Sequence, residues 1–400
     1  MEGQFSHKID TAAYKALNAL PNNPFHNLVR QDESDLAEQR KNFETSGHCP
    51  LFRYQKAESF DVAGYLDAIS SLTDQLPSLC QGNAIVEDLY LAKVDELKHR
   101  ALLVKAVQEK NDEEVTTLSE NIFSSLAFTL EDLESELQDM LSKERKLFIA
   151  EKSIKRNHFA TMAKKILDHY GMDDWKIAST ESSSIIIKHG SSKSSGRVLI
   201  PENFSVSSKR ATELLTHEIE VHTLRTNNGR QSPMLLLGRG LDRYVATEEG
   251  LAIFFQEKVT EKQKRHAPGF WNAYAIALAA EHNFAQVYEK LRLARTDIAR
   301  QAGNPEPENK GRDAAWRLCV RTYRGIHNTG KKGVAYRRDH IYRSGLIRMK
   351  KAVDNKGEGI LPLLFRGNIG LEHLERTKNL ALPAAPMPEL IAKDVVKSLS

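Results

Sequence analysis

The stretch His217-Glu218-Ile219-Glu220-Val221-His222 places two histidines, and a carboxylate beside the first, within six residues. About thirty residues later, Thr247-Glu248-Glu249-Gly250-Leu251-Ala252 adds a further acid on a second helix-like segment. A catalytic zinc ion needs three protein ligands, an open position for water, and a base that takes a proton from that water. These two segments together predict a hydrolytic zinc site.

The spacing of the histidines predicts an irregular helix. In the familiar H-E-x-x-H signature the histidines are four residues apart and share a helical face. Here the pattern is HExxxH, and five residues of regular helix separate the side chains by about 140° rather than about 40°. A π-type bulge between Glu218 and His222 is the expected solution. In the alternative interpretation His217 and His222 are ordinary helix residues, Glu220 is solvated, and no metal binds.

The preceding residues support a metal-binding helix. Residues 197–201 are typical of a strand, which Pro201 ends, and Ser207 or Ser208 can cap the helix that follows. A strand, a short loop and a metal-binding helix are the layout of many zinc peptidases, so a zincin-like catalytic domain is expected by analogy.

The combination of segments carries a family resemblance. His217 to Arg225 (HEIEVHTLR) and Thr247 to Ala252 (TEEGLA), with residues 284–288, 320–325 and 338–345, resemble the QEGLA-motif proteins. That family includes the microtubule-associated tyrosine carboxypeptidases, which remove the C-terminal tyrosine of α-tubulin. The resemblance spans about residues 48–375 and implies a zinc metallocarboxypeptidase.

Carried over residue by residue, the resemblance makes His217, His222 and Glu249 the ligands of one zinc ion per chain. Glu218 becomes the general base. Glu248 is the rival for the third ligand, but the family motif places its acid immediately before Gly-Leu-Ala. Two positions depart from the family: Glu248 replaces a common Gln, which we interpret as outside the chemistry, and Glu220 replaces a small residue.

Exopeptidase action also requires groups that bind an oxyanion and a terminal carboxylate. Tyr342 and Arg324 are the candidates for the oxyanion, with a purely structural role as the alternative. Guanidinium groups bind carboxylates by paired hydrogen bonds, so Arg230, Arg321 and Arg324 are the expected substrate-binding residues. The segment from 310 to 350 is strongly basic and contains aromatic residues. It favours an acidic peptide tail as partner over a merely solvated surface, and nucleic acid is the least favoured.

Composition describes an ordinary globular protein. The chain has 400 residues, of which 40% are hydrophobic and 28% charged, and its net charge of +4 is too small to argue for nucleic acid. Cys49, Cys80 and Cys319 are few and scattered, so no disulfide framework is expected. Without a signal-like or spanning apolar segment, we expect a cytoplasmic protein with no membrane partner. The oligomeric state stays open.

Periodicity divides the chain into an N-terminal arm (1–47), a helical N-terminal domain (48–150), a catalytic domain (151–382) and a C-terminal tail (383–400). Helices are expected over 62–76, 84–108, 112–127, from 130 into 143–155, over 159–170, from Glu249 to about 262, and over 271–301. Residues 175–178, 184–188 and 198–200 are expected strands, the last two forming a hairpin around a Gly/Ser-rich loop. The expected fold class is α+β and predominantly helical, with a small antiparallel sheet beside the metal-binding helix.

These observations predict a zinc-dependent metallocarboxypeptidase that hydrolyses the C-terminal peptide bond of a protein or peptide and releases tyrosine or another aromatic residue. Two alternatives remain. One is a zinc endopeptidase with the same site, and the other is a regulatory or binding protein in which zinc has no catalytic role.

Overall fold

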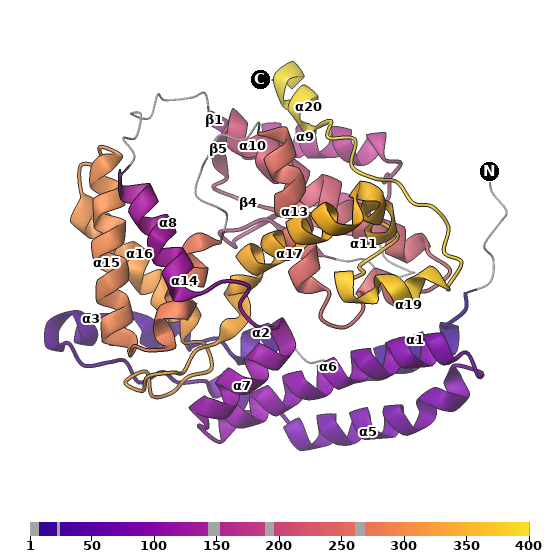
Figure 1. Cartoon of the computed structure of the whole chain (residues 1–400), viewed down its shortest axis with the longest axis horizontal. Coiled ribbons are helices and arrows are strands. Elements are labelled where there is room, and N and C mark those ends of the chain that lie inside the picture. Colours follow the sequence, from indigo (N-terminus) through magenta and orange to yellow (C-terminus); the bar gives the residue numbers. More distant parts are fainter. Residues whose placement is uncertain (1–7, 22–24, 143–152, 189–195, 261–268, 400) are drawn as a thin grey trace.

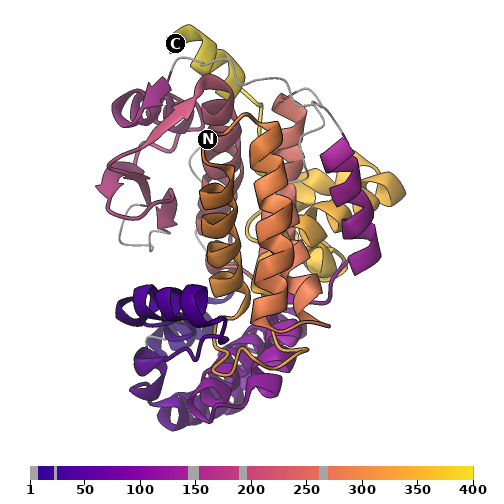
Figure 2. The ribbon, with the colours of Figure 1, turned by 90° about the vertical axis from the view of Figure 1, so that its left-hand side faces the viewer.

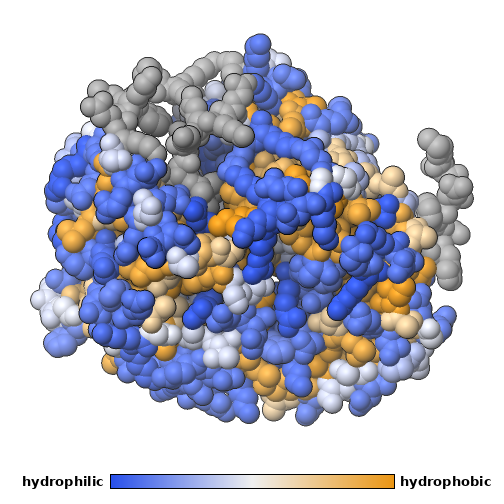
Figure 3. All heavy atoms as spheres, in the orientation of Figure 1, coloured by the Kyte–Doolittle hydropathy of each residue, from blue (hydrophilic) through white to orange (hydrophobic). Residues whose placement is uncertain are grey.

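The computed structural model describes residues 8–21, 25–142, 153–188, 196–260 and 269–399. Within them the chain is mainly helical and has two small sheets (Figure 1), which confirms the expected α+β class. None of the described helices is long and apolar enough to cross a membrane. On the face shown in Figure 3, apolar residues are interspersed with hydrophilic ones.

Most of the N-terminal helices lie in the lower part of the molecule in Figure 1, whereas the helix over residues 130–142 lies above them. Periodicity located several of them well: the helix over 84–108 has the expected bounds, and Asn83 caps it by accepting a hydrogen bond from the Val86 amide. The helix from Asp112 ends at Phe123, earlier than expected, because Ser124 has a φ of 68°. The helices are α1 (Thr11–Ala19), α2 (Phe25–Leu28), α3 (Glu33–Ser46), α4 (Gln55–Glu58), α5 (Val62–Leu79), α6 (Ala84–Gln108), α7 (Asp112–Phe123) and α8 (Leu130–Ser142).

The three-stranded sheet has the order β2-β4-β3, from β2 (Lys176–Thr180), β3 (Ile186–Lys188) and β4 (Arg197–Pro201). The expected hairpin is confirmed, since β3 and β4 are antiparallel with Ile187 opposite Val198. The sheet as a whole is mixed rather than antiparallel, because β2 pairs with β4 in parallel. The loop over 189–195 lies outside the described residues.

A second sheet corrects the helix expected through residue 155. Residues Ser153–Lys155 form β1, which pairs antiparallel with β5 (Ser205–Ser207), and α9 (Arg156–His169) follows directly. The tertiary partner fifty residues away overrides the local helical pattern of this polar segment. Residues 143–152 lie outside the described part of the chain.

The metal-motif helix has the irregularity that the histidine spacing predicts. It begins at α10 (Ser208–Leu215), where the Ser207 hydroxyl accepts a hydrogen bond from the Arg210 amide. It continues without interruption as the π-helix η1 (Thr216–Thr223) and then as α11 (Leu224–Gln231). The π-helical turns span the whole motif, so the predicted bulge is present although Glu220 is not a small residue.

The remaining helices follow the metal-motif helix along the chain. One prediction here is wrong: the single helix over 271–301 is two helices, because Asn283 starts a new one with a reciprocal capping box to Gln286. The elements are α12 (Leu236–Arg239), α13 (Val245–Val259), α14 (Phe270–Ala279), α15 (Phe284–Gln301), α16 (Pro307–Thr322), η2 (Arg337–His340), α17 (Ile341–Lys356), η3 (Glu358–Ile360), α18 (Leu361–Leu364), η4 (Leu371–His373), α19 (Leu374–Lys378) and α20 (Ala392–Leu399).

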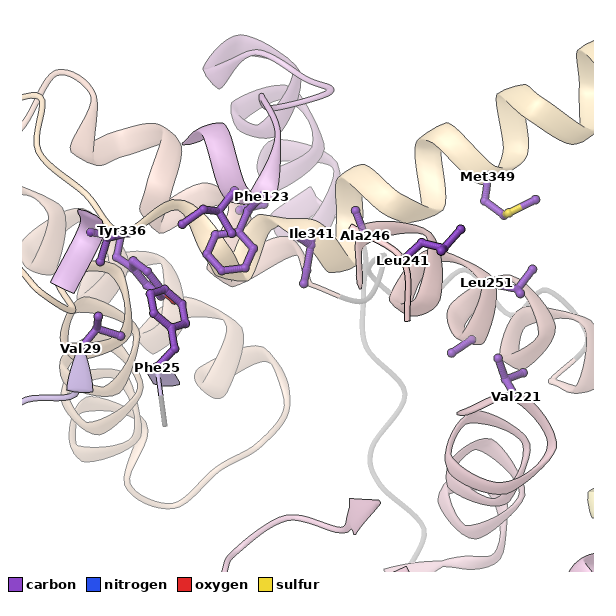
Figure 4. Close-up of a cluster of buried hydrophobic side chains, with 14 of the residues drawn as sticks. Phe25, Val29, Phe123, Val221, Leu241, Ala246, Leu251, Tyr336, Ile341 and Met349 are labelled. Atoms are coloured by element: carbon purple, nitrogen blue, oxygen red, sulfur yellow. The ribbon is translucent and has the colours of Figure 1, made fainter. Parts of the chain in front are cut away.

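Helices α13 and α17 cross the middle of the molecule and pack backbone to backbone (Figure 1). A Cβ atom on Gly250 would lie 2.2 Å from the carbonyl carbon of Gly345, and one on Gly345 would lie 2.0 Å from the carbonyl oxygen of Ala246. Only glycine at these two positions permits this approach. Val221 of η1, Leu251 of α13 and Met349 of α17 belong to the core beside this contact (Figure 4).

Both terminal segments are docked on the rest of the chain. The Asp10 carboxylate accepts hydrogen bonds from the backbone amides of Leu235 and Leu236, each at 2.9 Å. At the other end, α20 packs on α9 and α10, at the top of Figure 1 and of Figure 2. The helices of the arm and of the tail are therefore held by long-range contacts.

Candidate metal centre and cleft

A cleft of about 1030 Å³ lies over the metal motif. Its walls come from elements far apart in sequence: the hairpin strand β3, the helices α10, η1 and α13, and the segment where η2 meets α17. The lining residues that matter below are His26, His217, Glu218, His222, Glu248, Glu249, Arg338 and Tyr342.

His217, His222 and Glu249 converge in this cleft. One possible ligand atom from each residue lies within 4.8 Å of those of the other two. The Nε2 atoms of His217 and His222 lie 3.4 Å and 3.6 Å from Glu249 Oε2. The imidazole rings are 4.6 Å apart and nearly perpendicular, so the π-helical turns of η1 bring together side chains that a regular α-helix would separate.

The neighbouring glutamate has a different position. Glu248 Oε1 lies 2.6 Å from His222 Nδ1, and its other oxygen is hydrogen-bonded to the Arg225 guanidinium. A carboxylate on Nδ1 fixes the ring so that Nε2 faces the cluster. The substitution of Glu for Gln at 248 therefore does touch the site, which corrects our interpretation from sequence.

Arg225 is a supporting residue that sequence reasoning missed. Its side chain is fully buried and also donates to the carbonyl oxygens of Leu364 at 3.1 Å and Ile369 at 2.7 Å. The only signal for it was its place three residues after His222, one helical turn further along the motif helix.

The charges at the centre support one another. Burial raises the pKa of the Glu249 carboxyl, but His217 and His222 outweigh burial and leave that pKa below its usual range. Burial likewise raises the pKa of Glu248, but Arg225 and His222 lower it by more, so this pKa is also below its usual range. Both acids are therefore ionised at neutral pH.

A metal ion fits this arrangement. Among the described residues, Glu249 Oε2 is buried and has no hydrogen-bond partner, although it faces two imidazoles. A buried carboxylate oxygen without a donor is costly, and a cation between the three side chains would satisfy it. Two histidines and one glutamate form a donor set of catalytic zinc sites that leaves a position open.

Two predicted catalytic side chains share the cleft with these ligands. Glu218 follows His217 directly and lines the cleft. Tyr342, near the start of α17 and far from Glu218 in the sequence, also lines the cleft. The nearby charge of Glu249 and burial raise the Tyr342 pKa, so its hydroxyl keeps its proton and remains a donor.

The structure does not bring the predicted arginines into the described cleft lining. Arg230 lies beside Asp174 at 3.2 Å and over the Trp175 ring. Arg321 and Arg324 approach the buried carboxylate of Asp339, at 2.7 Å and 3.7 Å. Neighbouring Arg338, four residues before Tyr342, reaches the cleft instead.

Arg338 is thus the basic residue of the segment 310–350 that lines the described cleft, and sequence reasoning missed it. It is 3.4 Å from Asp339, which Arg321 and Arg324 also approach. Three guanidinium groups around one carboxylate leave this wall positive. Burial, followed by the charges of Arg338 and Arg100, lowers the pKa of His26 in the same cleft to about 3, so His26 is neutral.

A comparison with protein families now bears on this geometry. The family described as microtubule-associated tyrosine carboxypeptidase matches residues 41–384. The chain belongs to this family. Among curated proteins, no sequence matches it.

Membership in the tyrosine carboxypeptidase family makes the chain a peptidase of the carboxypeptidase type. The family segment contains the whole metal cluster, Glu218, Tyr342 and Arg338. Two parts of the described chain lie outside it: the arm that brings His26 to the cleft, and the tail after residue 384.

Proposed function

We propose that this chain is a zinc-dependent carboxypeptidase that releases tyrosine or another aromatic residue from the C-terminus of a peptide or protein. The observation that carries the proposal is the convergence of one ligand atom each from His217, His222 and Glu249, where the buried Glu249 Oε2 has no hydrogen-bond partner. The family name supports the direction of cleavage and the preference for tyrosine. The acidity of the substrate tail stays a prediction.

His217, His222 and Glu249 would hold the zinc ion, with Glu248 and Arg225 orienting His222 from behind. When bound, the ion supplies Lewis acidity, which polarises the scissile carbonyl and makes a water molecule nucleophilic at neutral pH. Glu218 accepts the proton of the attacking water and returns it to the leaving amine.

Tyr342 and Arg338 bind the two negatively charged groups of the reacting peptide, the oxyanion and the terminal carboxylate. The protonated Tyr342 hydroxyl donates a hydrogen bond to the oxygen that becomes negative during attack. The Arg338 guanidinium pairs with the terminal carboxylate by parallel hydrogen bonds, which selects a free C-terminus. An amidated peptide lacks that negative charge and so loses this contact.

The sheet provides a place for the substrate backbone. In the order β2-β4-β3, strand β3 is at an edge, and residues 184–187 line the cleft. An edge strand offers free backbone amides and carbonyls, to which an extended peptide can add as a further strand. This would direct the peptide past Glu218 toward Arg338.

Metal content and turnover test the proposal separately. We expect about one zinc per chain in the wild type, and a sharp loss of metal in His217→Ala and Glu249→Ala. Glu218→Gln should retain zinc and lose hydrolysis. Glu257→Gln is the matched control, since Glu257 lines the same cleft but is paired with Lys350 at 2.6 Å.

The substrate is tested with peptides that end in a free tyrosine, a free alanine or a tyrosine amide, and products are identified by mass spectrometry. Cleavage of the free-tyrosine peptide alone supports the proposal. Equal cleavage of the amide indicates an endopeptidase, and unchanged zinc content in both ligand variants excludes the proposed centre.

A further inference from the structure

Glu220 lies inside the metal motif but belongs to a different environment from its neighbours. Its side chain is fully buried, which contradicts the alternative of a solvated residue. It is absent from the described cleft lining, whereas Glu218 and His222 both contribute to it. A buried carboxylate is costly unless donors surround it, so its partners show what the residue does.

Four donors converge on the Glu220 carboxylate. The Tyr170 hydroxyl donates to Oε1 at 3.0 Å and the Thr216 hydroxyl to Oε2 at 3.3 Å. The other two are backbone amides from the beginning of α20, Ile391 to Oε1 at 3.0 Å and Ala392 to Oε2 at 3.4 Å. The amides at the start of a helix have no partners within it, so a carboxylate is a favourable cap there.

Further contacts hold the same part of the tail. The Tyr170 hydroxyl accepts a hydrogen bond from the Glu389 amide at 2.7 Å while it donates to Glu220. On α11, the Asn228 side chain donates to the Pro386 carbonyl at 2.9 Å. All these tail residues follow the family-matched segment, which ends at 384. The contact between tail and metal motif therefore involves residues outside the family-matched segment.

The position of this contact has a mechanical consequence. The π-helix is rare and occurs mostly as single turns inside α-helices, so a π-helical segment of eight residues needs contacts that favour it over regular α-helix. Here the π-helix η1 carries both histidines, and Glu220 ties its middle to α9 and α20. Loss of this tie would let the hydrogen bonds of η1 open more often and re-form in the regular α-helical pattern, in which His217 and His222 point apart.

We propose that residues 385–399 form a clasp that holds η1 in its π-helical form through Glu220. Glu220 is a positioning residue: docking of α20 sets the backbone of η1 and thereby the affinity of the three ligands for their metal ion. The part that concerns metal affinity rests on the proposed function. The part that concerns the backbone of η1 does not.

The test uses full-length variants that release the tail or remove its anchor. Val396 is buried where α20 packs on α9 and α10, so Val396→Asp should undock the helix without touching the metal motif. Ser398→Asp introduces the same side chain on the exposed side of α20 and is the matched control. Glu220→Gln removes the charge of the anchor, and the milder Tyr170→Phe removes one donor in case Glu220→Gln does not fold.

Two measurements separate the clasp from general stability. Hydrogen exchange of the metal-free proteins, at a temperature far below unfolding, reports on residues 216–223 and 392–399. Competition with a chelator reports zinc affinity. Val396→Asp and Glu220→Gln should accelerate exchange over 216–223 at least about tenfold and weaken zinc binding by about tenfold, comparable to the loss of an outer-shell partner of a metal ligand. Ser398→Asp should change neither.

Exchange over 216–223 that stays at the wild-type rate while 392–399 exchanges freely would overturn the clasp. So would equal acceleration throughout the chain, because that is a loss of global stability. If the wild type binds no zinc, the proposed function fails, but the exchange comparison still decides whether the tail holds η1.

Discussion

The close contact of α13 and α17 provides a sharp test of how the fold positions the cleft. In Gly345→Ala, the new Cβ would lie 2.0 Å from the Ala246 carbonyl oxygen and close to the backbone of Gly250. Carbon and oxygen need roughly 3.4 Å, so the helices must separate by about 1 Å. Neither neighbour is the end of a flexible side chain, and the strain cannot be relieved by a rotamer change.

Overpacking of this kind costs about 1–3 kcal/mol. For a chain of 400 residues, the entropy of unfolding is about 0.8 kcal/mol per kelvin, so the Tm should fall by about 1–4 °C. The loss of activity should be larger than this small loss of stability suggests. Tyr342 lies one turn from Gly345 and lines the same cleft as Glu249 of α13. A displacement of about 1 Å between reacting groups costs about a hundredfold in rate.

The assay compares kcat/KM for a peptide ending in free tyrosine with thermal unfolding of the same preparations. Gly359→Ala is the matched control, because a Cβ there meets nothing within 4 Å. If Gly345→Ala has the Tm and the kcat/KM of Gly359→Ala, the close approach of the two helices does not position the catalytic groups, and the reasoning fails.

Three further predictions concern individual side chains. Arg338→Ala should raise KM for a free C-terminus about tenfold or more through loss of a paired charge contact, whereas Arg230→Ala, outside the described cleft lining, should leave KM unchanged; steady-state kinetics with both variants decides this. Glu248→Gln should weaken zinc binding about tenfold, because His222 keeps a hydrogen-bond acceptor but Arg225 loses its buried counter-charge; chelator competition measures the change, and unaltered affinity would contradict the orienting role. Burial raises the pKa of Glu96, but Arg100 and Lys93 outweigh it and lower that pKa from 4.5 to about 2. Because the folded pKa is below the unfolded one, Glu96 stabilises the fold above pH 4.5 and loses this contribution as pH falls toward 2; denaturant unfolding of Glu96→Gln should show a weaker pH dependence than the wild type over that window.

Much of the helical framework was predictable because its signals are local. Apolar periodicity and the Asn83 cap located α6, and β-branched runs around a Gly/Ser loop located β3 and β4. The five-residue histidine spacing predicted the irregular helix from geometry alone. Two predictions are wrong: the single helix over 271–301, which a capping box at Asn283 and Gln286 divides, and the helix through residue 155, where β1 pairs with the distant β5.

The candidate site is likewise predictable only in part from local sequence. The adjacent acids at 248 and 249 are chemically alike, and the family motif alone favoured Glu249 as the ligand. The fold turns Glu249 toward both imidazoles and Glu248 toward His222 Nδ1 and Arg225. Arginines at 230, 321, 324 and 338 are chemically alike. In the fold, Arg230 is paired with Asp174, and Arg321 and Arg324 approach Asp339, whereas Arg338 lines the described cleft.

By itself, the sequence determined which chemical groups exist and how far apart they are along the chain: two histidines at an uneven spacing, a following acid, and helices with definite apolar faces. Tertiary structure decided which of those groups meet, including the tail amides that reach Glu220 from 171 positions away. The reason is that periodicity and capping act within a few residues. A cleft is formed by contacts between elements far apart in the chain, and their separation in sequence does not predict their distance in space.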